Sequence, residues 1–157
     1  IAADSTNCGV IYLSPQDTSG SISSSGLGVL SSRTSDPQQP QAGHGDGNVK
    51  FNVSSTAVFM SGFTANRAVT VINDGKSKDY AVFTPVTGPS QQYTTVAASM
   101  MKTVGAMVAY RDRGTGTSRQ VIVGALGVSS RTSMGHWTQA GKDLLVAAIG
   151  WARAGAP

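Results

Sequence analysis

The chain has 157 residues, one cysteine, a formal net charge of +4 and only 13% charged residues. This length suits one domain with its own core, and the apolar content excludes a wholly disordered chain. The lone Cys8 excludes an intrachain disulfide and a cysteine-based zinc site. Low charge combined with much Ser, Thr, Gly and Ala is typical of secreted or assembling proteins, so we expect an extracellular or cell-surface location.

The distribution of charge and of apolar residues limits which kinds of partner the chain is expected to bind. The basic residues are scattered, with no basic run and little aromatic interleaving, so the sequence does not indicate nucleic-acid binding. No apolar run reaches the length that a membrane-spanning helix needs. The Ser- and Gly-rich stretch 17–25 follows an expected strand, but it carries neither of the glycine motifs that cradle phosphates. We therefore predict no cofactor and no membrane span.

The N-terminal third predicts a tether, two strands and a long loop. Residues 1–7 are polar and read as a tether to a single domain over 8–157. The apolar run 8–13, ended by Ser-Pro, predicts a buried strand, and 26–30 predicts another short one. Residues 31–48 are rich in Pro, Gln, Gly and Asp, which predicts an exposed loop.

Two candidate ligands for a metal lie inside this loop. His44 and Asp46 are two residues apart and can offer a metal ion two ligands. The only other histidine, His136, is far along the chain. Because two ligands do not make a site, we predict a solvated turn here and no metal site.

The middle of the chain reads as strands. Val, Phe and Val alternate with polar residues over 49–53, and 68–72 is strongly β-branched, so both predict strands. The Asn-Asp-Gly sequence at 73–75 is a turn of hairpin type, which predicts that 80–83 pairs with 68–72. Two prolines and a glycine make 84–92 a loop.

The last third carries the clearest pattern. Residues 93–102 read as a strand running into a turn. Strands over 105–110 and 119–126 are joined by a polar turn, which predicts an antiparallel hairpin. Thr138 is the expected N-cap of a C-terminal helix. The expected apolar stripe of that helix consists of Leu144, Leu145, Ala148, Ile149, Trp151 and Ala152. A buried strand followed by a helix packed on its face is typical of α/β folds.

These segments, taken in order, resemble a known family. The Gly-Ala-Met-Val-Ala-Tyr strand at 105–110, a glycine-containing turn and the Arg-Gln-Val-Ile-Val-Gly-Ala strand at 119–125 are followed by 137–145 and 148–152. This order resembles the C-terminal half of class I glutamine-amidotransferase-like domains, in particular the non-catalytic, trehalose-utilisation-type branch found in secreted bacterial proteins. The resemblance is strongest over 105–155.

The resemblance implies a particular fold, and it implies that the N-terminal part of this fold is missing. The fold it implies is a flavodoxin-like mixed sheet, strand-rich, with the C-terminal helix packed on it. The family begins with a strand and a helix that this chain lacks, so we expect a fold that is incomplete on its N-terminal side. Such uncovered edges are satisfied by another chain or by the rest of a longer polypeptide. Catalytic members carry a Gly-x-Cys-x-Gly elbow that holds the nucleophile. This motif is absent from the chain, so the resemblance does not imply amidotransferase activity.

The main functional hypothesis is a non-catalytic extracellular structural or binding domain, either self-associating as a homo-oligomer or part of a larger polypeptide. Carbohydrate is a candidate ligand, with Trp137 and Tyr93 as stacking platforms, although a tryptophan beside a helix start is also a common packing residue.

Two alternatives stay open. The first is a hydrolase, with Cys8 or a loop serine as nucleophile, His44 or His136 as base and Asp46 as the orienting group. The second is a virion coat or filament subunit, which the small size and moderate positive charge suit.

Overall fold

The computed structural model describes residues 9–13, 30–32, 48–73, 84–85, 93–101, 105–112, 119–126 and 133–154, and the statements below refer to them. The strands are β1 (Val10–Leu13), β2 (Leu30–Ser32), β3 (Asn48–Val53), β4 (Ala68–Asn73), β5 (Thr84–Pro85), β6 (Thr94–Ser99), β7 (Ala106–Arg111) and β8 (Gln120–Val123). The helices are three short 3₁₀ turns, η1 (Val58–Met60), η2 (Gly124–Leu126) and η3 (Met134–His136), and the α-helix α2 (Gln139–Arg153).

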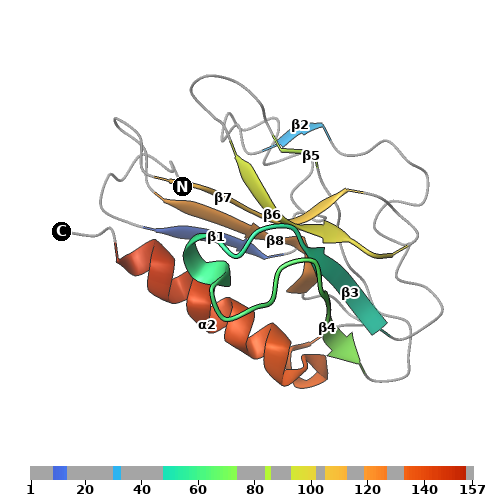
Figure 1. Ribbon diagram of the computed structural model, residues 1–157. Helices are drawn as coiled ribbons and strands as arrows, with labels where there is room; N and C mark the ends of the chain where they lie inside the picture. The colour runs from blue at the N-terminus through green and yellow to red at the C-terminus, as the bar shows by residue number, and fades with distance from the viewer. Residues whose placement is uncertain are drawn as a thin grey trace.

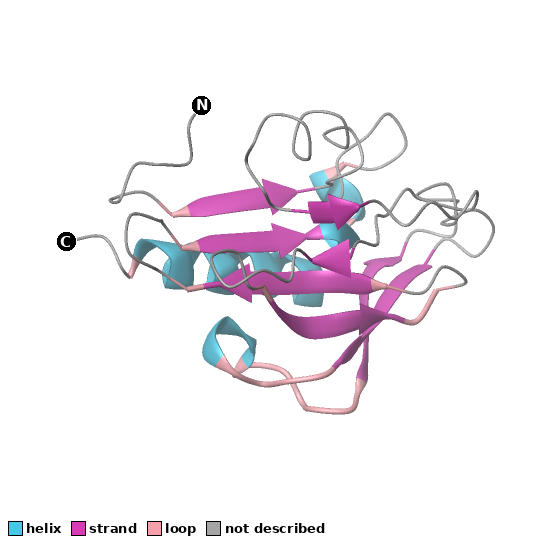
Figure 2. Ribbon diagram, turned by 90° about the horizontal axis from the view of Figure 1, so that it is seen from above, coloured by secondary structure: helices cyan, strands magenta, loops and turns pink. Residues whose placement is uncertain are grey.

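The main sheet has six strands in the order β1-β8-β7-β6-β3-β4. The β1–β8 pair is parallel and the other neighbours are antiparallel. Helix α2 lies along one face of this sheet, and η1 lies beside the helix (Figures 1 and 2). The predicted fold class, a strand-rich mixed α/β sheet with a C-terminal helix packed on it, is confirmed.

The β7–β8 hairpin lies inside the sheet and is confirmed. Val108 pairs with Val123 and Tyr110 with Val121 in antiparallel register. All four residues of β8 are buried, as the continuous β-branched run predicts for a strand covered on both faces. The predicted strand 119–126 ends earlier than expected, because Gly124–Leu126 turn into η2.

Strand β1 joins the sheet beside β8 and lies close to the end of α2. The Val10 N–H donates to the Arg119 carbonyl at 2.9 Å. Gly9, just before the strand, lies so near the helix that a Cβ there would sit 2.5 Å from the Ala152 carbonyl oxygen. A residue without a side chain therefore allows β1 and the last turn of α2 to approach.

Helix α2 begins where it was predicted to begin. The Thr138 hydroxyl accepts from the Gly141 N–H at 3.1 Å, which satisfies one of the free donors of the first turn. The side chains of Leu144, Ala148 and Ala152 are buried against the sheet. Ile149 was predicted to belong to this stripe, but it is 39% exposed. It lies about a quarter of a turn from the centre of the buried face, so it sits at its margin.

Two predicted loops contain short strands. Leu30–Ser32 and Thr84–Pro85 pair as an antiparallel two-stranded sheet, although Ser31 and Ser32 fell in the predicted loop 31–48 and β5 in the predicted loop 84–92. Neither segment alternates apolar and polar residues, so the sequence carries no strand signal there. The tether 1–7, most of the loop 31–48 and the predicted partner strand 80–83 lie outside the described residues.

Strand β4 is the edge of the main sheet, and part of this edge is covered. Pairing with β3 shifts register between Val49 and Lys50, which leaves Val71 as an extra residue on β4. The bulge turns two successive carbonyls outward. Thr138 takes both, since its N–H donates to the Val71 oxygen at 2.9 Å and its hydroxyl to the Thr70 oxygen at 2.8 Å. The residue that caps α2 thus also fastens the helix start to the sheet edge.

Within the described residues, no helix combines the length and the apolar character that crossing a bilayer requires.

Candidate functional site

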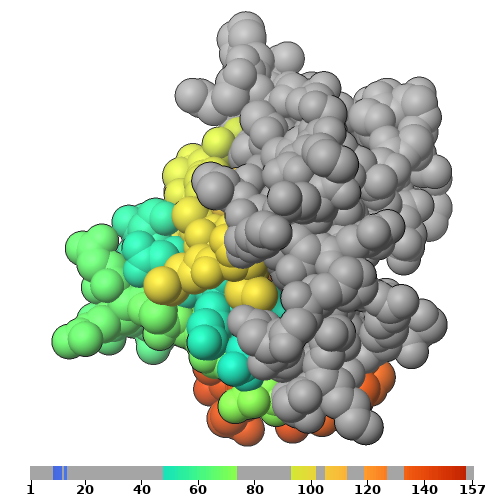
Figure 3. All heavy atoms as spheres, turned by 90° about the vertical axis from the view of Figure 1, so that its right-hand side faces the viewer, coloured from blue at the N-terminus to red at the C-terminus, as the bar shows by residue number. Residues whose placement is uncertain are grey.

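A groove of about 800 Å³ opens between α2, the start of β4 and the segment that carries η1. In Figure 3 the segment from β3 to β4 lies at the surface, in teal to green, with α2 in orange beneath it. The groove is lined by Phe59, Ser61, Gly62, Phe63, Thr64, Arg67, Ala68, Val69, Thr70, Ala140, Asp143 and Ala147. Its size is in the range of ligand-binding clefts.

One wall of the groove is held rigid by aromatic packing. The ring of Phe59 lies 5.7 Å from that of Trp151 and 6.2 Å from that of Tyr110, measured between centroids. Phe63 packs edge-on against Phe51, with centroids 6.4 Å apart. Such contacts add to the burial of the rings, so this wall is preformed.

The backbone that leads into this wall is strained. Val58 has φ of 49°, a left-handed conformation that β-branched residues rarely adopt. The next two residues, Phe59 and Met60, are buried, and their packing holds the chain in this conformation. Strain of this kind persists where the surroundings determine the backbone, and it clusters at binding sites.

The opposite wall is one face of α2 with small side chains. Ala140, Asp143 and Ala147 follow each other at spacings of three and four, which places them on one side of the helix. The two alanines leave the space that the groove occupies. The Asp143 carboxylate accepts from Gln139 Nε2 at 2.7 Å, so it already has a partner on its own helix.

The floor is the part of the β4 edge that Thr138 does not cover. The Arg67 oxygen accepts from the Val53 N–H, and the Asn66 N–H donates to the Val53 oxygen. Because backbone groups alternate sides along a strand, Val69 also faces β3, and Ala68 and Thr70 face outward into the groove. The Thr70 oxygen is bound by Thr138. Within the described residues, the outward groups of this edge that remain without a partner are the N–H and C=O of Ala68 and the N–H of Thr70.

The groove is lined by one charged residue of each sign, Arg67 and Asp143. The side chain of Arg67 is exposed, and no hydrogen bond or ion pair joins its guanidinium to another described residue. Asp143 is bound by Gln139, as above. An anionic group entering the groove would therefore find Arg67 available.

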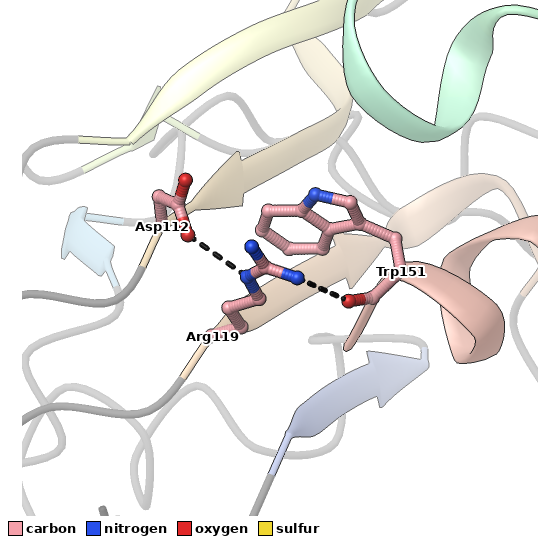
Figure 4. A network of polar contacts seen from close by, with 3 residues as sticks. All are labelled: Asp112, Arg119 and Trp151. Carbon is pink, nitrogen blue, oxygen red and sulfur yellow. Dashed lines mark hydrogen bonds and ion pairs between the residues drawn. The ribbon is translucent and has the colours of Figure 1, made fainter. Parts of the chain in front are cut away.

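A second polar cluster lies at the other end of α2 (Figure 4). Arg119 Nε donates to Asp112 Oδ1 at 2.9 Å and its Nη1 to the Trp151 carbonyl at 2.9 Å, while the guanidinium carbon lies 4.7 Å from the Trp151 ring centroid. A cation at the C-terminal end of a helix interacts favourably with the helix dipole. The cluster fastens the β7–β8 hairpin to the helix, and Arg119 Nε and Nη1 are both engaged in doing so.

His136 is the one predicted catalytic candidate among the described residues. It lies beside Ser133: its Nδ1 accepts from the Ser133 N–H at 3.0 Å, and the Ser133 hydroxyl oxygen is 3.3 Å from the same nitrogen. Neutral imidazole has one acceptor nitrogen with one lone pair. Since the backbone N–H already uses that lone pair, Nδ1 is poorly placed to take the hydroxyl proton. The pair acts as a local cap of η3.

The two predicted stacking residues are both buried. Trp137 is 4% exposed and belongs to the hydrophobic core, and Tyr93 is 6% exposed. The Tyr93 hydroxyl donates to Gln120 Oε1, and the Arg111 guanidinium lies 5.4 Å from its ring centroid. A sugar needs an open ring face to stack on, so packing describes both residues better than sugar contact.

The other sequence candidates, Cys8, His44 and Asp46, lie outside the described residues. Among the residues that are described, no group of three or more His, Cys, Asp or Glu side chains is placed to hold a metal ion.

Sequence reasoning did not single out the groove. Arg67 counted only as one of the scattered basic residues, and Asp143 lies on the polar side of a helix. The one available signal was the apolar run 57–63 ending in Gly62 and Phe63, which is too short for a core helix and lacks the apolar-polar alternation of a half-buried strand.

Comparison of the chain with protein-family models, with curated proteins and with solved structures found no match.

Proposed function

We propose that this chain is a non-catalytic extracellular structural or binding domain that self-associates or forms part of a larger polypeptide, of the trehalose-utilisation type among glutamine-amidotransferase-like domains. The observation that carries the binding role is the groove between η1, β4 and α2. It combines a preformed aromatic wall, open backbone groups and the available Arg67. These are the features of a surface that holds a partner.

Support for self-association comes from the outer face of α2. Val146 is 68% exposed and lies on the side of the helix that turns away from the sheet, and Ile149, 39% exposed, lies between that side and the buried face. Neighbouring exposed apolar residues on a helix are a feature of contact surfaces.

Native mass tests self-association. We expect light scattering at micromolar protein to give a mass that is a multiple of 16.1 kDa, with or without reductant. Val146→Lys should lower that mass, because a charge in an apolar contact is unfavourable. The matched control is Lys142→Arg, an exposed change on the same helix that keeps the charge. A 16.1 kDa species under all conditions contradicts self-association.

A hydrolase is the second candidate, because Ser133 lies 3.3 Å from His136 Nδ1. The two functions predict different reactivity toward a fluorophosphonate that labels activated serines. We expect no stoichiometric labelling of the folded protein, since the acceptor lone pair of Nδ1 is engaged by a backbone N–H. Labelling that disappears in both Ser133→Ala and His136→Ala would favour the hydrolase over the binding domain.

A further inference from the structure

We propose that the groove receives an extended peptide segment of a partner protein, which carries an acidic side chain and pairs with the outer edge of β4 at Ala68–Thr70. This inference rests on the proposed function, because it names the partner of the binding surface described above.

The backbone of β4 provides the first reason. Ala68 presents an N–H and a C=O toward the groove and Thr70 presents an N–H, and none of the three is used by the β3–β4 ladder. An extended peptide added to a sheet edge forms its hydrogen bonds with groups of this kind, arranged in this way. A globular surface or a sugar ring does not match their spacing along a strand.

The ends of the open edge set the length of the segment. On one side, Trp137 and Thr138 already occupy the edge beside Ile72 and Val71. On the other side, Asn66 has φ of 58°, a left-handed conformation that ends the extended strand. The peptide therefore pairs over the three residues from Ala68 to Thr70, and its flanking residues leave the sheet.

The walls of the groove determine which side chains fit. Successive side chains of an extended segment point to opposite sides. The side that faces α2 meets Ala140 and Ala147, whose small side chains leave room for an apolar residue. The aromatic wall with Phe59 and Phe63 offers an apolar surface across from the helix.

The positive charge of Arg67 favours an acidic side chain on the peptide. Arg67 directly precedes β4, is exposed, and makes no ion pair with another described residue. Its planar guanidinium can bind a carboxylate through two parallel hydrogen bonds. Asp143, on the helix side of the groove, keeps its negative charge in its hydrogen bond with Gln139 and repels an acidic residue there. An acidic side chain is therefore expected next to Arg67, at the β4 end of the groove.

The test uses a displayed library of random peptides, selected against the whole chain, followed by anisotropy titrations with synthetic copies of the enriched sequences. We expect the enriched peptides to share an acidic residue and an apolar residue in an alternating pattern. Ala68→Pro should weaken their binding by roughly tenfold, since it removes one open donor and obstructs pairing. Ala68→Val keeps the N–H and is the matched control, with binding within about twofold of the wild type.

Two further variants test the groove without the Ala68→Pro substitution, which can itself disturb the strand. Ala147→Leu fills the groove from α2 and should also weaken binding, and Arg67→Glu should lower the affinity for acidic peptides. Failure to enrich any peptide overturns the inference, as does enrichment of peptides that bind all variants and wild type equally. Binding of a sugar or of a second copy of the chain in the groove, with no peptide binding there, also overturns it. Assembly measured by light scattering is unaffected by these results, so the proposed function can stand when the inference fails.

Discussion

Replacing Leu144 with alanine is expected to lower the free energy of unfolding by about 2–5 kcal/mol. Leu144 is fully buried and packs in the core cluster between α2 and the sheet. Truncation removes its apolar contacts and leaves a cavity that the surrounding strands cannot close fully. Urea denaturation followed by tryptophan fluorescence measures the change.

The control for this substitution lies two residues earlier on the same helix. Lys142 is exposed, so Lys142→Ala removes little buried surface and should change stability by less than about 0.5 kcal/mol. If the two variants are equally stable, α2 does not pack on the sheet as described, and the groove that it borders would not exist in this form.

Gly141→Ala is expected to destabilise the protein by about 1–3 kcal/mol, although alanine is ordinarily the better helix residue. A Cβ at position 141 would lie 2.6 Å from the Val71 carbonyl oxygen and 3.1 Å from a methyl carbon of Leu126. The Val71 oxygen is backbone and is held by the Thr138 N–H, so it cannot move aside easily. The overlap outweighs the gain in helix propensity.

Gly150 is the matched control, because it lies in the same helix with nothing within 4 Å of an added Cβ. Gly150→Ala should therefore stabilise the protein by about 0.5–1 kcal/mol. Opposite signs for the two glycines, in the same denaturation experiment, are the expected result. A stabilising Gly141→Ala would mean that the first turn of α2 does not lie against the β4 edge.

The sequence predicted the elements whose pattern is local. Alternation identified β3, the β-branched runs identified β4 and β8, and the hydroxyl of Thr138 identified the start of α2. In each case the residues that define the element are neighbours in the chain. Their burial follows from the period of the pattern, which does not require knowledge of the partner.

The parts that the sequence could not predict depend on contacts between distant segments. Strands β2 and β5 form only because Leu30–Ser32 meets Thr84–Pro85. The groove is assembled from three segments, and it depends on the bulge at Val71 and on the path of the chain after Val58. Neither feature has a sequence pattern of its own. Trp137 and Tyr93 were predicted as stacking platforms for a carbohydrate, yet both are buried in the core.

The most direct test of the binding groove is amide hydrogen exchange at Ala68 and Thr70, measured by NMR with and without a selected acidic peptide. We expect exchange of these two amides to slow on binding, because the peptide supplies acceptors that the folded chain does not. The amide of Val69, which faces β3, serves as the internal reference. Saturating peptide that leaves both amides exchanging at their original rates would contradict the claim that the β4 edge is the binding surface.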